Sequence, residues 1–283
     1  MSEFIGTKLT MNLGERSYDI ILKSGALENL YQFARLDRRV AVVTDSGVPA
    51  QYAQRVADQC KDAKIITVPQ GEASKSFKIL ETVLRQMLEF NMGRGDLVIA
   101  VGGGVVGDLA GFAASIYMRG IDFINCPTTT LSMIDSSIGG KTAVDLGDTK
   151  NIVGAFWQPK LVIVDPETLS TLPRRHYING LAEAVKGIKG RRTVGLFHGE
   201  CVALGMLPMI ESKALQKRVR AVYRRLGLPL RTTYNKEKVL AEMLHDKKAQ
   251  GGQITIIKVP GLGCWRAETI PVEGLRPLLG MEE

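Results

Sequence analysis

Apolar and polar positions alternate along the first part of the chain. Residues 8–22, KLTMNLGERSYDIIL, alternate around Gly14 and Glu15, which predicts a β-hairpin. Short apolar runs bounded by polar or turn residues follow at intervals, and each predicts a buried strand. These runs are residues 38–47, 65–69, 96–104, 122–127 and 161–166.

Helical periodicity fills the spaces between these runs. A helix is expected through Cys60, and two more over residues 77–89 and 109–118. Strands that alternate with helices predict a parallel, wound sheet with helices on both faces. The pattern changes after about Pro173, where the rest is expected to be helical apart from a short strand at 254–259. A domain boundary is therefore expected near residues 166–175.

A glycine-rich segment follows the predicted strand at 96–104. Gly102-Gly103-Gly104-Val105-Val106-Gly107 satisfies G-x-G-x-x-G between a strand and a helix, the context in which this motif binds a pyrophosphate. The alternative is a tight turn that merely needs glycine. The acid about 20 residues on, Asp122, begins the next strand instead of ending it, and Asp108 at the helix start would repel phosphate. We expect a phosphate-binding loop that differs from the ordinary dinucleotide fingerprint.

The segment IDSSIGGKTAVD (residues 134–145) ends like a P-loop. A Walker A motif needs glycine where Asp135 stands and a strand just before it, which excludes an NTPase of that class. Gly139 and Gly140 followed by Lys141 can form an amide nest with a cation over an anion. The alternative is a surface turn with solvated lysines.

Two candidate metal ligands flank a glycine-rich break. Glu183 lies in GLAEAVK, on the same helix face as Lys186, and His198 opens the next predicted helix. A Glu-Lys pair at this spacing is commonly a surface ion pair, and a histidine at a helix start is commonly a cap. Glutamate and histidine together suit Zn²⁺, but a third protein ligand is expected.

Composition limits the classes of protein. Hydrophobic residues make up 45% and charged residues 23% of the 283, as in soluble globular proteins. The four cysteines lie far apart with no CxxC pair, and the amino-terminal stretch lacks a signal-peptide layout, so we expect reduced thiols in a cytoplasmic protein. The most apolar region, residues 97–118, carries Asp108 and five glycines, which argues against a membrane span.

The formal net charge is +8. The basic runs of the chain lack interleaved aromatic residues, which argues against a nucleic-acid partner. A small substrate that bears phosphate or carboxylate fits this moderate basic excess better.

The motifs together resemble 3-dehydroquinate synthase of the sugar phosphate cyclase superfamily. The resemblance covers nearly the whole chain in the family order. It rests on LGERSYDI, VTDSGV, GEASKSF, AVGGGVVGDLAGFAASIYMRGIDFINCPTTTLSMIDSSIGGKTAVD, KNIVGAFWQP, TLP, GLAEAVK, FHGECVALGM and DKK. It implies an α/β fold: a Rossmann-like, parallel-sheet, NAD-binding domain at residues 1–170, then a shortened α-helical domain at 171–283 for metal and substrate, with the site in the cleft between them.

The resemblance also implies the chemistry. The family converts 3-deoxy-D-arabino-heptulosonate 7-phosphate, a phosphorylated seven-carbon sugar acid, to 3-dehydroquinate and phosphate in the shikimate pathway. It uses NAD and a divalent metal, Zn²⁺ or Co²⁺, and its members are commonly homodimers. A ring hydroxyl is transiently oxidised so that phosphate can be eliminated, after which the ring opens and an aldol step closes the carbocycle.

Carried over by motif, the implied site residues fall into three groups. Metal ligands are Glu183 and His198. Groups at the substrate are Lys141, Asn151, Lys186, Lys247 and Lys248. Cofactor contacts are Asp45, Gly71, Glu72, Ala73, Ser74, Lys75, Gly104, Val105, Val106, Gly107, Asp108, Thr128, Thr129, Lys141, Lys150, Thr168, Leu169, Ser170 and Thr171. In this assignment Asp108 lies on the nicotinamide side of the glycine loop.

The chain departs from the family pattern between residues 186 and 198. Family members carry several dozen helical residues there, including N-x-G-H-T-x-x-H-A, whose first histidine is the third metal ligand, and an acidic run that ends in a substrate-binding arginine. GIKGRRTVG stands in their place, which implies an internal deletion near residues 187–196. We therefore expect weak metal binding, impaired activity and exposed apolar surface in the second domain.

Other residues of the chain are weak candidates to replace the missing third metal ligand and the missing substrate-binding arginine. His176 is expected in a loop before the Glu183 helix, where a capping or exposed role fits better. His245, beside Asp246-Lys247-Lys248, is the better candidate for a third ligand, but we do not expect it to serve. Arg191 or Arg192 as a replacement for the lost arginine is weaker still. The alternatives to a dehydroquinate synthase are another sugar phosphate cyclase and a non-catalytic NAD-binding remnant.

Overall fold

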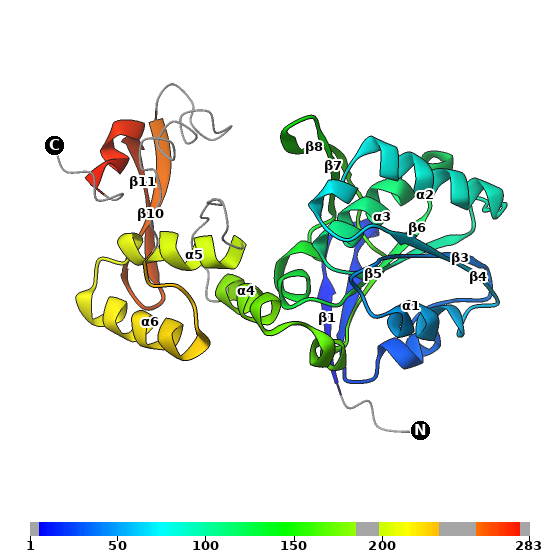
Figure 1. Ribbon diagram of the computed structural model, residues 1–283, viewed down its shortest axis with the longest axis horizontal. Coiled ribbons are helices and arrows are strands. Elements are labelled where there is room, and N and C mark those ends of the chain that lie inside the picture. The colour runs from blue at the N-terminus through cyan, green and yellow to red at the C-terminus, as the bar shows by residue number, and fades with distance from the viewer. Residues whose placement is uncertain (1–5, 185–197, 232–252, 278–283) are drawn as a thin grey trace. The chain divides into compact units, whose positions relative to one another are not determined.

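The computed structural model describes residues 6–184, 198–231 and 253–277. The chain divides into two compact units, residues 1–177 and 178–283, and the division falls within helix α4 (Arg174–Ala184). The predicted boundary lay at residue 170, seven residues earlier. Figure 1 shows the elements of both units.

The first unit is built on a seven-stranded sheet. Its strand order is β1-β2-β9-β6-β5-β3-β4, with β1 antiparallel to β2 and every later pairing parallel. The hairpin and the buried strands expected from the sequence are present. Their bounds are β1 Thr7–Met11, β2 Tyr18–Leu22, β3 Arg39–Asp45, β4 Asp62–Val68, β5 Leu97–Gly102, β6 Asp122–Pro127 and β9 Leu161–Val164.

Helices cover both faces of this sheet, as the alternation of strands and helices predicted. Successive residues of a strand point to opposite faces, so Ala41 and Val43 join one core while Val40 and Val42 join the other. The first core packs under α2 (Phe77–Glu89) and α3 (Gly104–Ile116), and the second under α1 (Ala50–Ala57) and the 3₁₀ helix η2 (Leu27–Gln32).

Helix α3 begins earlier than the sequence suggested. The glycine segment was expected to be a turn with a helix over residues 109–118, but the helix already starts at Gly104. Gly107 lies inside it because a Cβ there would sit 3.0 Å from Asn125 Nδ2 on β6, so a glycine lets helix and strand approach closely. Asp108 is therefore the fifth residue of the helix rather than its start.

A second hairpin, β7 (Lys141–Leu146) with β8 (Thr149–Phe156), was not predicted. It packs on α3, where a Cβ at Gly111 would lie 2.4 Å from Thr142 Cγ2. Val144 is fully buried in the core beneath α3. The GGKT segment thus leads into a strand and is part of the domain's packing.

The remaining short elements of this unit are η1 Gly14–Arg16, η3 Glu72–Ser74, η4 Tyr117–Arg119, η5 Ser132–Ser136 and η6 Pro166–Thr171.

The second unit combines helices with a hairpin. Its described elements are α5 His198–Met206, η7 Leu207–Met209, α6 Lys213–Leu226, β10 Gln253–Gly261, β11 Cys264–Pro271 and η8 Val272–Leu275. Ser212 caps the start of α6 by accepting the Leu215 N–H, and Gly227, with φ 74°, ends it in a left-handed conformation.

The expectation that this unit is helical apart from one short strand was wrong. Strand β11 pairs antiparallel with β10, which places Ile270 opposite Ile254. The described core of the unit is small and centres on Tyr223, Ala203 and Leu207, with Val202 and Met206 packed towards β10. In the parts of the chain that the structure describes, no helix combines the length and apolar character that crossing a membrane requires.

Candidate active site

The carboxyl ends of the parallel strands gather the residues predicted to contact NAD. Asp45 ends β3, and the segments after β4, β5, β6 and β9 supply the others except Lys141 and Lys150, which lie in β7 and β8. Parallel strands share a direction, so these loops lie along one edge of the sheet, where open α/β sheets bind ligands. Backbone hydrogen bonds join neighbouring strand ends: the Thr128 N–H donates to Gly102 O over 2.9 Å, and the Ser46 N–H to Val68 O over 2.9 Å.

The glycine loop places the start of α3 at this edge. Gly102 is required by packing, since a Cβ there would lie 2.6 Å from Val106 Cγ2. A Cβ at Gly104 would lie 2.8 Å from Ser136 Oγ. Among the described residues, no side chain caps the helix at Gly103, so its first N–H groups remain available to an anion.

Asp45 holds the turn that follows β3. It is 8% exposed, and its Oδ1 accepts hydrogen bonds from the N–H groups of Gly47 at 2.8 Å and Val48 at 3.2 Å. This arrangement orients the carboxylate without needing a ligand. Oδ2 of the same carboxylate takes no part in these two bonds.

The loop after β4 bends at Gly71, whose φ is 102°. Ser74 is buried, with its hydroxyl donating to Pro69 O over 2.5 Å, while Ala73 is exposed. Glu72 pairs with Lys150 of β8 at 3.0 Å. Two predicted cofactor residues that are far apart in sequence are thus brought together.

The threonines at the other strand ends have internal partners. Thr129 Oγ1 lies 2.8 Å from Ser132 Oγ, and Thr168 Oγ1 donates to Asp165 O over 2.8 Å. Thr171 Oγ1 lies 2.9 Å from the hydroxyl of Tyr52 on α1. In η6 the Ser170 hydroxyl donates to Glu167 O, and Leu169 is half-buried. These groups shape the loops around the predicted nucleotide site.

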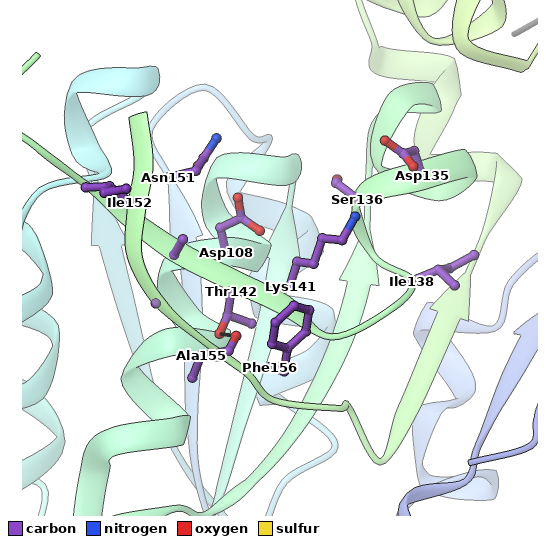
Figure 2. Close-up of a pocket in the computed structure, with 12 residues that line it drawn as sticks. Asp108, Asp135, Ser136, Ile138, Lys141, Thr142, Asn151, Ile152, Ala155 and Phe156 are labelled. Atoms are coloured by element: carbon purple, nitrogen blue, oxygen red, sulfur yellow. Dashed lines mark hydrogen bonds between the residues drawn. The ribbon is translucent and has the colours of Figure 1, made fainter. Parts of the chain in front are cut away.

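A cavity of about 500 Å³ lies beside the start of α3 (Figure 2). It has the size of a small-molecule site. Its polar lining includes two of the predicted substrate residues, Lys141 and Asn151, together with Asp108. The lining residues are Asp108, Asp135, Ser136, Ile138, Lys141, Thr142, Ala143, Asn151, Ile152, Gly154, Ala155 and Phe156.

Asp135 and Ser136 were not among the predicted site residues. Both belong to the π-helical turn η5, and Ser136 Oγ is a buried atom without a hydrogen-bond partner among the described groups. An orphaned buried hydroxyl calls for a ligand or water. In the sequence Asp135 served only to exclude a Walker motif, although its place four residues before Gly139 was a usable signal.

Lys75 and Asp108 form the most buried ion pair of this region. Lys75 Nζ lies 2.5 Å from Asp108 Oδ2, with the lysine side chain 4% and the aspartate 19% exposed, and it also donates to Asn151 Oδ1. Burial raises the pKa of Asp108, and the lysine opposes that rise without cancelling it. The repulsion expected between Asp108 and a phosphate is thus reduced by a cation in direct contact.

The amide nest at Gly139 and Gly140, one of the two alternatives for this segment, has one of its two N–H groups already engaged. Both glycines have positive φ, 94° and 65°, as a nest needs, but the Gly139 N–H donates to the hydroxyl oxygen of Tyr18 over 3.1 Å. A Cβ at Gly140 would collide with the Gln158 amide. The turn leads directly into Lys141, which begins β7 and lines the cavity.

The predicted metal ligands are placed only in part. Glu183 lies in α4 and His198 is the first residue of α5, but their side chains lie outside what the structure describes. The described residues contain no cluster of three histidines, cysteines or carboxylates that could hold a metal. Also outside the described residues are Lys186, Lys247, Lys248, His245, Arg191 and Arg192.

His176 is not in a loop, as was expected, but in the first turn of α4. Seven residues separate it from Glu183, which corresponds to about 10.5 Å along a helix. Ligands of one zinc ion approach it to about 2.1 Å each. His176 is therefore badly placed to complete a site with Glu183.

The first unit fits a dinucleotide. The uncapped α3 terminus suits a pyrophosphate. The absence of a side chain at Gly104 lets Ser136 approach this terminus closely, and the orphaned Ser136 hydroxyl offers a donor there.

The sequence matches known proteins along most of its length. Residues 65–179 match the family model for the amino-terminal part of 3-dehydroquinate synthase. The chain is 34% identical to the 3-dehydroquinate synthase of Pelobacter propionicus over 355 aligned residues, covering 97% of this chain and 99% of that protein. It is 46% identical to that of Rhodopirellula baltica over 191 residues, covering 63% of this chain and 51% of that protein.

The first of these alignments is longer than the chain. It runs over 355 positions, whereas 97% of 283 residues is about 275, so about 80 positions have no counterpart in this chain. The difference agrees in size with the expected internal deletion. Its place between residues 186 and 198 stays a prediction.

Solved structures share the fold. A 2-deoxy-scyllo-inosose synthase, complexed with carbaglucose-6-phosphate, NAD⁺ and Co²⁺, superposes with a TM-score of 0.85 at 19% identity, covering 96% of this chain and 99% of that one. The 2-epi-5-epi-valiolone synthase of Streptomyces hygroscopicus, with NAD⁺ and Zn²⁺ bound, gives 0.79 at 24% identity with the same coverage. The full-length similarity to the Pelobacter protein, carried on this shared fold, shows that the chain belongs to the 3-dehydroquinate synthase family.

Proposed function

We propose that this chain is a 3-dehydroquinate synthase, which converts 3-deoxy-D-arabino-heptulosonate 7-phosphate to 3-dehydroquinate and phosphate. The observation that carries the proposal is the cavity of about 500 Å³ beside the uncapped start of α3, lined by Asp108, Lys141 and Asn151 in a member of this family. The cavity adjoins the edge of the sheet that we assign to the nucleotide, and its polar side chains suit a small anionic substrate.

The residues divide the work by position. Helix α3 directs its first N–H groups to the pyrophosphate, and Asp45 accepts a ribose hydroxyl. Asp108 faces the nicotinamide. The exposed ammonium of Lys141 neutralises an anionic group of the sugar acid, and Asn151 hydrogen-bonds to it. Bound NAD⁺ would supply the transient oxidation of a ring hydroxyl to a ketone, which acidifies the neighbouring proton so that phosphate can be eliminated.

The remaining groups belong to the second unit. Glu183 and His198 are the proposed ligands of Zn²⁺ or Co²⁺, which would polarise the reacting oxygen. Lys186, Lys247 and Lys248 are proposed to contact the substrate. Two protein ligands bind a metal weakly, so full activity should require added metal.

A homodimer in the cytoplasm completes the proposal. A second groove, of about 420 Å³, lies between α2 and the end of α3, and exposes Leu88, Ile116 and Met118. Met118 and Arg119 both adopt positive φ, 50° and 71°, which is unfavourable for such residues and typical of functional positions. We propose that a second copy covers this groove.

The cytoplasm is the proposed compartment, because the free thiols of Cys60, Cys126 and Cys264 fit a reducing environment.

The dimer is tested by Leu88→Glu, measured by light scattering after gel filtration. A dimer that dissociates in the variant supports the proposal, while Gln51→Glu, at an exposed position of α1, adds the same single negative charge and serves as the control. A wild-type monomer at micromolar concentration would contradict it.

The reaction is tested by mixing the chain with the sugar acid phosphate, NAD⁺ and Zn²⁺ or Co²⁺, and identifying the product by NMR. The expected product is 3-dehydroquinate with one phosphate released per molecule. Turnover of a different sugar phosphate, with none of this substrate, would indicate another cyclase. NAD⁺ binding without any turnover would indicate a non-catalytic remnant.

A further inference from the structure

The ammonium of Lys75 connects two walls of the cavity. It donates to Asp108 Oδ2 on α3 and to Asn151 Oδ1 on β8, and the lysine side chain is 4% exposed. Asp108 and Asn151 both line the cavity, whereas Lys75 lies behind them and is not one of the described residues in its lining. A buried ammonium with two oxygen partners holds them at fixed positions.

This contact determines which face Asn151 presents. A carboxamide has one acceptor oxygen and one nitrogen with two donors, and an ammonium can only donate. With Oδ1 bound to Lys75, the donors of Nδ2 are left to face other groups. Asn151 therefore offers the cavity a hydrogen-bond donor, which suits a carboxylate, phosphate or carbonyl oxygen.

Asp145 fixes the backbone of both Lys75 and Asn151. Its Oδ1 accepts the Asn151 N–H at 2.7 Å, and its own N–H donates to Lys75 O at 2.8 Å. It occupies an irregularity in the β7–β8 pairing, between Val144 and Leu146. The bond to Asp145 also supports the left-handed backbone of Asn151, whose φ is 52°.

We propose that Lys75 and Asp145 are positioning residues, which hold Asn151 so that its amide N–H groups meet an acceptor oxygen of the substrate. The proposal rests on the proposed function only in taking the cavity as the substrate site. Lys75 also sets the distance between the nicotinamide side, at Asp108, and the substrate side, at Asn151.

Two substitutions at Asp145 separate its hydrogen bond from its charge. Asp145→Asn keeps an oxygen that accepts the Asn151 N–H, so kcat/KM should stay within about threefold of wild type. Asp145→Ala removes the acceptor, and kcat/KM should fall about tenfold, mainly through KM for the sugar phosphate. The dissociation constant of NAD⁺ should change less than about twofold. Equal effects of both substitutions, or a loss confined to NAD⁺ affinity, would overturn the proposal.

A double-mutant cycle tests the action of Lys75 through Asn151. Lys75→Met should raise KM for the sugar phosphate strongly in the wild-type background and add little to the rise in KM caused by Asn151→Ala. Lys78→Met, an exposed lysine on α2, is the matched control and should leave kcat/KM unchanged. Additive effects of Lys75→Met and Asn151→Ala would mean that Lys75 acts independently.

One readout does not depend on turnover. In spectra of protein labelled with ¹⁵N-asparagine, the side-chain signal that disappears in Asn151→Asp belongs to Asn151. Lys75→Met should shift this signal, and Lys78→Met should not. An unmoved signal would refute the contact between Lys75 and Asn151. A shifted signal in a protein that binds neither NAD⁺ nor sugar phosphate would refute the proposed function and leave this contact supported.

Discussion

Lys75 Nζ lies 2.5 Å from Asp108 Oδ2, and the two residues are 33 positions apart in the sequence. The contact joins the loop after β4 to helix α3 at the edge where the predicted cofactor residues gather. It places a buried cation directly against the carboxylate nearest the glycine loop.

The first prediction concerns pH. Burial raises the pKa of Asp108 above its ordinary value of 3.8, so the folded protein binds this proton more tightly than the unfolded chain does. The contribution of Asp108 to stability is complete below pH 3.8 and is lost as pH rises through the raised value. Asp108→Asn removes this titration, so the stability of the variant relative to wild type should rise across that interval. Urea unfolding at several pH values measures it, and a difference that is constant or falls with pH would refute the assignment.

The second prediction concerns Gly154 of β8. A Cβ there would lie 2.0 Å from Thr142 O, a backbone atom that cannot move without shifting β7. Gly154→Ala should destabilise the protein by about 1–3 kcal/mol, as overpacking does. It should also weaken substrate binding, because this hairpin carries Lys141 and Asn151. Gly95→Ala, where a Cβ meets open space, is the control, and similar melting temperatures for both variants would contradict the packing argument.

The third prediction separates two roles of Asp45. Asp45→Asn keeps an oxygen for the Gly47 and Val48 N–H groups but loses the charge that strengthens a bond to ribose. Its stability should match wild type within about 0.5 kcal/mol, while NAD⁺ should bind about tenfold more weakly. Asp45→Ala should lose about 1 kcal/mol of stability as well. Calorimetric titration and thermal unfolding measure the two quantities, and unchanged NAD⁺ affinity in both variants would remove Asp45 from the site.

The fourth prediction concerns the metal. Glu183→Ala and His198→Ala should each abolish the small amount of Zn²⁺ retained after dialysis, measured by mass spectrometry, while NAD⁺ affinity stays the same. His176→Ala is the control, because a helical rise of about 10.5 Å separates it from Glu183. Retention of metal in both of the first two variants would show that other groups bind it.

The parallel sheet was predictable because its inner strands β3, β5, β6 and β9 are largely apolar runs, buried on both faces between turn residues. Val98 and Ile99, for example, are both fully buried although they point to opposite faces. Hairpin β7–β8 was missed because much of it is exposed and polar, as at Lys150 and Asn151, so its sequence resembles a loop. The glycine pair before it drew attention to anion binding instead.

The site was predictable as a set of loops but not as a set of contacts. The bond from Lys75 to Asn151 spans 76 positions, and no local pattern encodes it. Asp135 and Ser136 reach the cavity because η5 is wound as a π-helical turn, a conformation that sequence periodicity does not indicate. In contrast, the gathering of the loops at the carboxyl ends of the parallel strands follows from the topology of the sheet alone.

The most direct test of the central claim is phosphate release from 3-deoxy-D-arabino-heptulosonate 7-phosphate by the wild-type chain with NAD⁺, with and without added Zn²⁺ or Co²⁺. We predict release that requires both NAD⁺ and metal, and that falls at least tenfold in Asn151→Ala. Absence of release in a protein that binds NAD⁺ and metal would contradict the account and leave only a nucleotide-binding domain.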